Sequence, residues 1–207
     1  TLYRFKELTS YQSNNLTMIY GQPKKLPDGR YYLKISTDEG KPYVIQMNNS
    51  TLVTRFAESE EVTISLSEKS IEKIKAINAQ NLVAAKENST EWFGKDVSDK
   101  TLDAAYNPKV NGDTMIAGKV TVNKNVVTRC YDHQKVQISS DDLQEDTASD
   151  IMLELSGLWF MKKTFGPIWR IAQMRLKAPK KKIYTEEFMF EDSDDDNSPE
   201  ENDEDYI

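Results

Sequence analysis

Short runs rich in β-branched and aromatic residues, separated by turn-forming residues, dominate the chain up to residue 176. Runs of this kind predict β-strands. The predicted strands cover residues 30–35, 43–47, 62–66, 114–122, 126–131, 151–160 and 168–176. Turn signals at 27–29, 40–42, 123–125 and 161–167 bound these runs. They predict two hairpins, formed by the first and second and by the fourth and fifth strands. The sixth and seventh strands, which are the longest and clearest, are joined by residues 161–167.

One segment breaks this pattern. Residues 68–87 contain neither Gly nor Pro, and Ile71, Ile74, Leu82 and Ala85 fall on one helical face. Ser65 and Glu68 have the spacing of a capping box. We therefore expect an amphipathic helix at about 66–87, inserted between strands, followed by an irregular loop at about 88–112.

The strand count defines the expected fold class. Five to seven short strands with one intervening helix predict a mainly β protein, an OB-fold Greek-key barrel with one inserted helix. A β-sandwich is also compatible, because counting strands does not determine topology. Residues 1–185 form the expected OB domain. Residues 186–207 are highly charged and poor in apolar residues, which predicts a disordered acidic tail.

Charge is divided sharply along the chain. Residues 186–207 hold 12 acidic and no basic residues, which leaves 27 basic and 22 acidic residues in the body. Residues 156–185 hold eight basic residues and no acidic one. Ordinary protein surfaces mix both signs, so this one-signed stretch indicates a polyanionic partner.

Aromatic and basic residues recur together, which is typical of proteins that bind single-stranded nucleic acid. Basic groups would follow the phosphates and flat side chains would stack on bases. In an extended strand, neighbouring residues point to opposite faces, so about half of the aromatics are expected in the core. The candidate nucleic-acid-binding residues are Tyr31, Tyr32, Lys34, Tyr43, Arg129, Tyr131, Lys135, Trp159, Phe160, Lys162, Lys163, Trp169, Arg170 and Arg175.

Catalytic and metal-binding motifs are sparse. Cys130 and His133 are the chain's sole Cys and His, and a structural zinc site needs four ligands, so no metal site and no cofactor are predicted. The sequence lacks a glycine-rich phosphate loop and a Gly-x-Ser-x-Gly motif, and an enzyme is not expected. A single cysteine fits an intracellular, reducing compartment. No run approaches 18 apolar residues, so no membrane span is expected.

The acidic segment suggests regulation. A polyanion tethered near a cationic groove competes with the DNA backbone at high effective concentration. Bound DNA would release the tail to partner proteins, and Asp203, Glu204, Asp205, Tyr206 and Ile207 at its end are the candidate partner-binding residues.

The segment from Ser149 to Leu176 carries a family resemblance. SDIMLELSGLWF leads through a basic aromatic turn with Gly166 to IWRIAQMRL, and the acidic tail follows. In order and character this resembles the gene 2.5-type single-stranded DNA-binding proteins of short-tailed phages, and more closely their versions in large nucleocytoplasmic DNA viruses. The resemblance covers residues 114–207 well and the first hundred residues only in layout. Tails of the family commonly end on Phe, whereas this one ends on Tyr206-Ile207.

That resemblance implies an OB barrel that coats single-stranded DNA in viral replication, recombination or repair. It implies tail contacts with a polymerase or a helicase/primase, a homodimer, and action at a viral replication site in the host cytoplasm or nucleus. Two alternatives remain open. An acidic-tailed chaperone for basic clients would bind no DNA, and an RNA-binding OB protein would use the same kind of stacking surface.

Overall fold

The computed structural model describes residues 17–56, 60–122 and 125–178, so the predicted tail at 186–207 lies outside the described residues. The strands are β1 (Ile19–Tyr20), β2 (Lys24–Lys25), β3 (Tyr31–Ser36), β4 (Tyr43–Leu52), β5 (Glu61–Ser65), β6 (Val110–Asn111), β7 (Thr114–Lys119), β8 (Thr121–Val122), β9 (Asn125–Val126), β10 (Arg129–Tyr131), β11 (Gln137–Ile138), β12 (Ala148–Phe160) and β13 (Phe165–Leu176). The helices are α1 (Glu68–Glu87), α2 (Ser89–Phe93), α3 (Asp99–Ala105) and the short 3₁₀ helix η1 (Ser140–Asp142).

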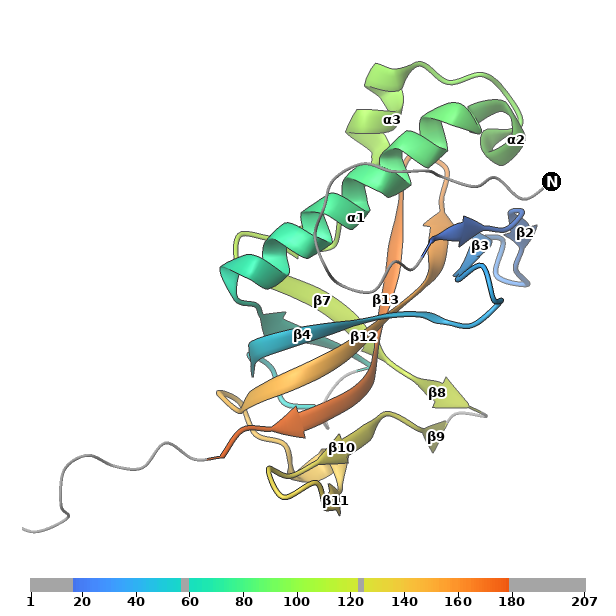
Figure 1. Cartoon of the computed structure of the whole chain (residues 1–207). Coiled ribbons are helices and arrows are strands. Elements are labelled where there is room, and N and C mark those ends of the chain that lie inside the picture. The colour runs from blue at the N-terminus through green and yellow to red at the C-terminus, as the bar shows by residue number, and fades with distance from the viewer. Residues whose placement is uncertain (1–16, 57–59, 123–124, 179–207) are drawn as a thin grey trace, which may run out of the picture.

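Five strands close into a barrel. β4 pairs with β5, β5 with β7, β7 with β13, β13 with β12, and β12 again with β4 (Figure 1). The β7–β13 pairing is parallel and the other four are antiparallel. Numbered along the chain, the strands close in the order one, two, three, five, four, which is the order of an OB barrel. The predicted mainly β, OB-fold class is confirmed.

β12 is long enough to pair with two strands on the same edge. Its first half lies against β4, and its second half, Gly157 to Phe160, lies against β3. This arrangement corrects the first predicted hairpin, since β3 and β4 meet only at the bridge between Ser36 and Pro42. The 13 residues of β12 offer more backbone hydrogen-bonding groups than β4 alone can pair, and β3 takes the remainder.

The second predicted hairpin forms only in part, whereas the two longest predicted strands pair with each other. β12 and β13 are hydrogen-bonded along most of their length. In the fourth and fifth predicted strands only the tips, β8 and β9, pair with each other. β7 and β10 instead pair in parallel with β13, along the edge of β13 opposite β12. The long β13 thus provides a common partner that no local turn signal could reveal.

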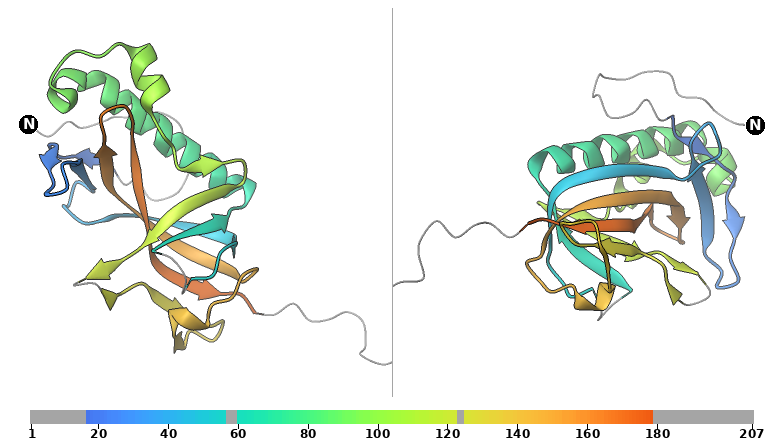
Figure 2. Two further views of the ribbon diagram at one scale, coloured as in Figure 1. Left: turned by 180° about the vertical axis from the view of Figure 1, so that it is seen from behind. Right: turned by 60° about the horizontal axis from the view of Figure 1, so that its bottom comes forward.

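Helix α1 packs against one side of the barrel (Figure 2). Ile71, Ile74 and Ile77 enter the core from its buried face. The capping-box prediction is wrong, because the N-cap is Ser67 and not Ser65. Ser65 ends β5, and its hydroxyl pairs with the Asp113 carboxylate at 3.1 Å.

The predicted irregular loop at 88–112 is also wrong, since it contains α2, α3 and β6. Aromatic packing orders this segment. Trp92 and Phe93 pack edge-on against Phe160, and Phe93 also meets Phe165, with ring centroids 5.3–6.1 Å apart. These contacts attach α2 to the far end of the β12–β13 hairpin (Figure 1). Short helices lacking apolar periodicity escape pattern analysis, because their stability comes from tertiary contacts.

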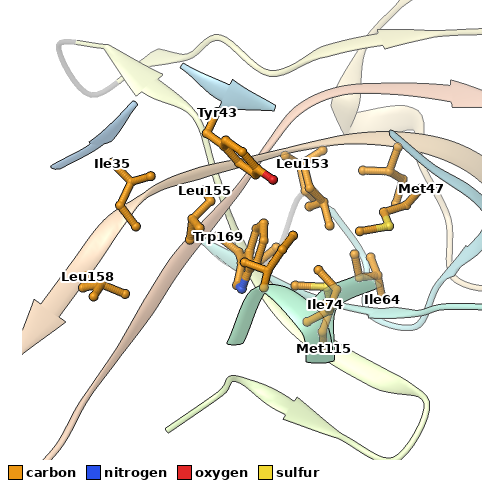
Figure 3. Close-up of a cluster of buried hydrophobic side chains, with 14 of the residues drawn as sticks. Ile35, Tyr43, Met47, Ile64, Ile74, Met115, Leu153, Leu155, Leu158 and Trp169 are labelled. Carbon is orange, nitrogen blue, oxygen red and sulfur yellow. The ribbon is translucent and has the colours of Figure 1, made fainter. Parts of the chain in front are cut away.

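Alternate residues of the strands fill the barrel. Ile64, Met115, Leu153 and Leu155 are at most 1% exposed, and Trp169 lies among them (Figure 3). The period of two seen in the sequence therefore matches the burial pattern of the barrel strands. No helix in the described ranges is both long and apolar enough to cross a membrane.

Candidate nucleic-acid interface

Three of the aromatics predicted to stack on bases lie in the core instead. Tyr43, Phe160 and Trp169 are 8%, 5% and 3% exposed. Figure 3 shows Tyr43 and Trp169 within the cluster of buried side chains. The stacking prediction is wrong for these residues. Strand alternation limits each pair of neighbours to one outward side chain, and Trp159 is outward where Phe160 is inward.

Two other aromatics lie side by side on the opposite face of the sheet. Tyr32 on β3 is directly opposite Trp159 on β12. This row of directly opposed residues on neighbouring strands continues to Lys24 on β2 and to Gly166 on β13. Directly opposed residues share a face of a sheet. We call the face of β3, β12 and β13 that carries Tyr32 and Trp159 the outer face.

A glycine lies near each of these rings, and Gly157 leaves room for the Tyr32 ring. A Cβ at Gly157 would lie 2.7 Å from Cε2 of Tyr32, so the tyrosine ring lies across Gly157. Its hydroxyl donates a hydrogen bond of 2.6 Å to the carbonyl oxygen of Ser156. A Cβ at Gly166 would lie at an ordinary contact distance of 3.5 Å from Nε1 of Trp159, and the close approach at Gly166 is that of the Asn107 carbonyl oxygen. Each ring thus lies near a glycine of β12 or β13, and both remain partly exposed. Together they form an aromatic platform, Tyr32 and Trp159.

Basic side chains surround the aromatic platform. Lys34 is exposed opposite Gly157, and Arg170 is partly exposed opposite Glu154. Burial raises the pKa of the Tyr32 hydroxyl, an effect that the nearby charge of Arg170 opposes. Lys162 and Lys163 are exposed in the turn between β12 and β13, which is closed by a hydrogen bond from Met161 to Thr164. Glu154 lowers the positive charge of this face, but the surrounding cations outnumber it.

The outer face continues toward the other end of β12 and β13. One row joins Gln46, Met152, Gln173 and Arg129, and the next joins Asp150, Arg175 and Tyr131. A pocket of about 290 Å³ lies over these rows. Its lining residues are Gln46, Tyr131, Lys135, Asp150, Ile151, Met152, Gln173, Met174 and Arg175. We call it the β10–β13 pocket. It brings Tyr131, Lys135 and Arg175, all predicted from the sequence, into one place.

Asp150 is the structural centre of this end. A bulge places two residues of β4 opposite Asp150, and the Asn49 N–H donates to the carboxylate at 3.2 Å. Arg175 and Lys177 also contact the carboxylate, at 2.6 and 2.7 Å. Burial alone would raise the pKa of Asp150, but its hydrogen bonds from Lys177, Arg175 and Asn49 hold it below the usual range. The carboxylate thus anchors Arg175 beside the pocket.

The face most often used by OB folds has a different composition here. Those folds commonly bind oligonucleotides across their second and third strands, which are β5 and β7 in this chain. Neither strand contains an aromatic residue. Nearby, the ammonium of Lys119 lies 4.8 Å from the centre of the buried Phe56 ring, and Lys109 pairs with Glu61 at 3.5 Å. Flat side chains for stacking are therefore found on the outer face and not on β5 and β7.

Sequence reasoning missed several residues of this surface. Gln46, Met152 and Gln173 belong to its rows but carry no motif. Gly157 could have indicated the position of this surface, because a glycine within a strand often marks a close approach of other atoms. Tyr31, which is 44% exposed, is opposite Phe160 and so belongs to the other face of the sheet.

The structure adds little to a catalytic interpretation. Across residues 17–56, 60–122 and 125–178, no group of three or more His, Cys, Asp or Glu side chains is arranged to hold a metal ion. Cys130 is buried, whereas His133 is exposed in the turn that follows β10. The five candidate partner-binding residues at 203–207 lie outside the described residues.

The chain matches a family described as a family of unknown function (DUF5871) over residues 49–192. That match covers more than half of the chain, so the chain belongs to this family. No curated protein matches it. Among solved structures, it is similar to a single-stranded DNA-binding protein from bacteriophage Enc34 in complex with ssDNA. The identity is 9% over 83% of this chain and 100% of that one, with a TM-score of 0.44. Membership of the gene 2.5-type family stays a prediction.

Proposed function

We propose that this member of the DUF5871 family binds single-stranded DNA along the outer face of its OB barrel. The observation that carries the proposal is the aromatic platform, in which Tyr32 and Trp159 lie over glycine-containing strands with basic residues around them. Stacking on such rings contributes about 1–3 kcal/mol for each base. It depends little on base identity, so the expected binding has no strong sequence preference.

The charge around the platform favours a flexible anionic backbone. Lys34, Arg170 and the Lys162–Lys163 turn lie on different sides of the two rings. A single strand can unstack and place its bases on the rings while its phosphates follow these cations. A duplex keeps its bases paired and stacked inside the helix. The platform therefore supports binding of single strands in preference to duplex.

The acidic segment at 186–207 enters the proposal through its charge. Its 12 acidic residues are joined to a body with an excess of basic residues. A tethered polyanion competes with phosphates for the same cations, and the competition weakens as salt screens it. We extend the proposal to a role in DNA replication, recombination or repair, in which the end of the tail, Asp203 to Ile207, recruits a replication protein.

The test is the anisotropy of a labelled oligo-dT strand and of its duplex, titrated with the protein over a salt series. Wild type should prefer the single strand, and Trp159→Ala should weaken binding by about five-fold to 150-fold, the loss of one stacked base. Lys100→Ala, on the exposed surface of α3, should bind as wild type does.

Equal affinity for strand and duplex, or an unchanged affinity in Trp159→Ala, would contradict the proposal. A chain ending at Thr185 should bind more tightly at low salt if the acidic segment competes, and equally at high salt. A competition between DNA and RNA strands of one sequence then determines which sugar is preferred, because stacking itself accepts both.

A further inference from the structure

The β10–β13 pocket lies on the same face as the aromatic platform, along the same strand. Met152 in the pocket and Trp159 in the platform are seven residues apart on β12, which corresponds to about 23 Å at roughly 3.3 Å per residue. Arg170 and Glu154 lie on this face between them. A single DNA strand that stacks on Tyr32 and Trp159 and extends along β12 and β13 therefore passes over the pocket.

The pocket combines an apolar interior with a polar and cationic rim. Met152 on the outer face supplies apolar surface, and the ring of Tyr131 adds a flat side, whereas Ile151 and Met174 are fully buried in the core beneath. Gln46 and Gln173 contribute carboxamides, whose donors and acceptors suit the edge of a nucleobase. A nucleobase is a flat, partly apolar group with polar edges, and the 290 Å³ pocket accommodates one.

Local contacts determine where the two cationic residues of the rim lie. Arg175 donates to the buried carboxylate of Asp150 at 2.6 Å and is itself 47% exposed. Lys135 lies within a turn in which the Asp132 carboxylate accepts hydrogen bonds from the backbone N–H groups of Gln134 and Val136, both at 2.8 Å. Lys135 adopts a left-handed backbone conformation with φ of 69° in this turn. The ion pair thus holds the Arg175 guanidinium beside the pocket, and the hydrogen-bonded turn sets where the Lys135 backbone lies.

We infer that the β10–β13 pocket accepts one nucleobase of the bound single strand, with the adjoining phosphate on Lys135 and Arg175. The inference rests on the proposed function and adds to it a second, separate contact point. Bases between the platform and the pocket would pass over Arg170. The distance between the platform and the pocket is compatible with the site size of an OB fold, which is about 4–16 nucleotides.

Photocrosslinking tests the inference directly. A single-stranded oligonucleotide of about 16 nucleotides that contains 5-iododeoxyuridine is irradiated with the full chain, and the attached residues are found by mass spectrometry. We expect attachment at Tyr131 as well as at Trp159 or Tyr32. In parallel, Tyr131→Ala and Gln173→Ala should each weaken binding of this strand by about five-fold or more, as for loss of one held base. Gln80→Ala, on the exposed side of α1, should bind as wild type does.

The possible results separate this inference from the proposed function. Attachment at Trp159 or Tyr32 without Tyr131, together with unchanged affinity in both pocket variants, overturns the pocket assignment and leaves the platform standing. Failure of the wild-type chain to bind any single strand overturns the proposed function and the pocket with it. Gln173→Ala keeps the test sound if Tyr131→Ala does not fold, because Gln173 is exposed at the pocket rim.

Discussion

The ring of Tyr32 lies across Gly157, 2.7 Å from where a side chain at that position would begin. Such a side chain would also collide with the carbonyl oxygen of Leu33 in the neighbouring strand. Gly157 therefore lets β3 approach β12 closely and gives Tyr32 its place on the outer face.

Gly157→Ala should displace both β3 and the Tyr32 ring. Overpacking of this kind costs about 1–3 kcal/mol, and the clash here involves backbone as well as side chain. We expect a lower melting temperature and weaker binding of single strands. Gly118→Ala is a suitable control, because a Cβ there would meet only contacts of 3.7 Å or longer. Gly29→Ala is not suitable, because φ at Gly29 is 84° and an alanine there would be strained. Wild-type stability in Gly157→Ala would show that the strands tolerate the clash.

The two tryptophans of the β12–β13 hairpin should separate stability from binding. Trp169 is 3% exposed in the core, and Trp169→Ala should cost about 3–5 kcal/mol of unfolding free energy. Trp159 is on the outer face, so Trp159→Ala should chiefly weaken binding. Denaturant unfolding measured beside strand binding distinguishes the two effects. Similar unfolding free energies for the two variants would contradict this assignment.

The Lys162–Lys163 turn should contribute to the salt dependence of binding. Each phosphate contact on a single strand adds about 0.7 to the slope of log affinity against log salt. Replacing both lysines by alanine should therefore reduce this slope by about one to two units. Lys100→Ala is the single-charge comparison away from the outer face, and it should leave the slope unchanged. An unaltered slope in the double variant would place the turn outside the DNA path.

Asp150 should make the fold sensitive to acid. Its pKa in the folded chain lies below the ordinary value of about 3.9, so its stabilising contribution is present above that value. The contribution is lost as the pH falls through the lowered, folded-state pKa. Asp150→Asn should thus be less stable than wild type near neutral pH, with the difference narrowing below about pH 4. Asp38→Asn, at an exposed position, should show no comparable difference in denaturant unfolding at either pH.

Cys130 should react slowly with thiol reagents in the folded chain. It is 1% exposed, and burial raises the pKa of its thiol to about 11. Since the thiolate is the reactive form, little of it is present at neutral pH. Labelling in native buffer should be far slower than in denaturant, where the sole cysteine is free to react. Equal rates would mean that β10 opens readily from β13.

Much of the secondary structure could be predicted from local sequence, because it depends on local periodicity. The long strands β12 and β13 and the helix α1 each have a clear pattern of apolar positions. The pairing partners could not be predicted in this way. β3 and β10 join β12 and β13 through contacts between distant residues, and no turn signal encodes those contacts.

The sequence by itself determined which residue types were present for binding: aromatics beside an excess of basic side chains, divided from an acidic segment. Only the tertiary structure decided which of them meet on one surface. Strand alternation sends one of two neighbours inward, but the bulges in β12 and β13 set which one. They place Trp159 outward and Trp169 inward, and they align Tyr32, Arg170 and Arg175 along one face. The reason is physical: register and bulges depend on hydrogen bonds between strands that are far apart in the chain.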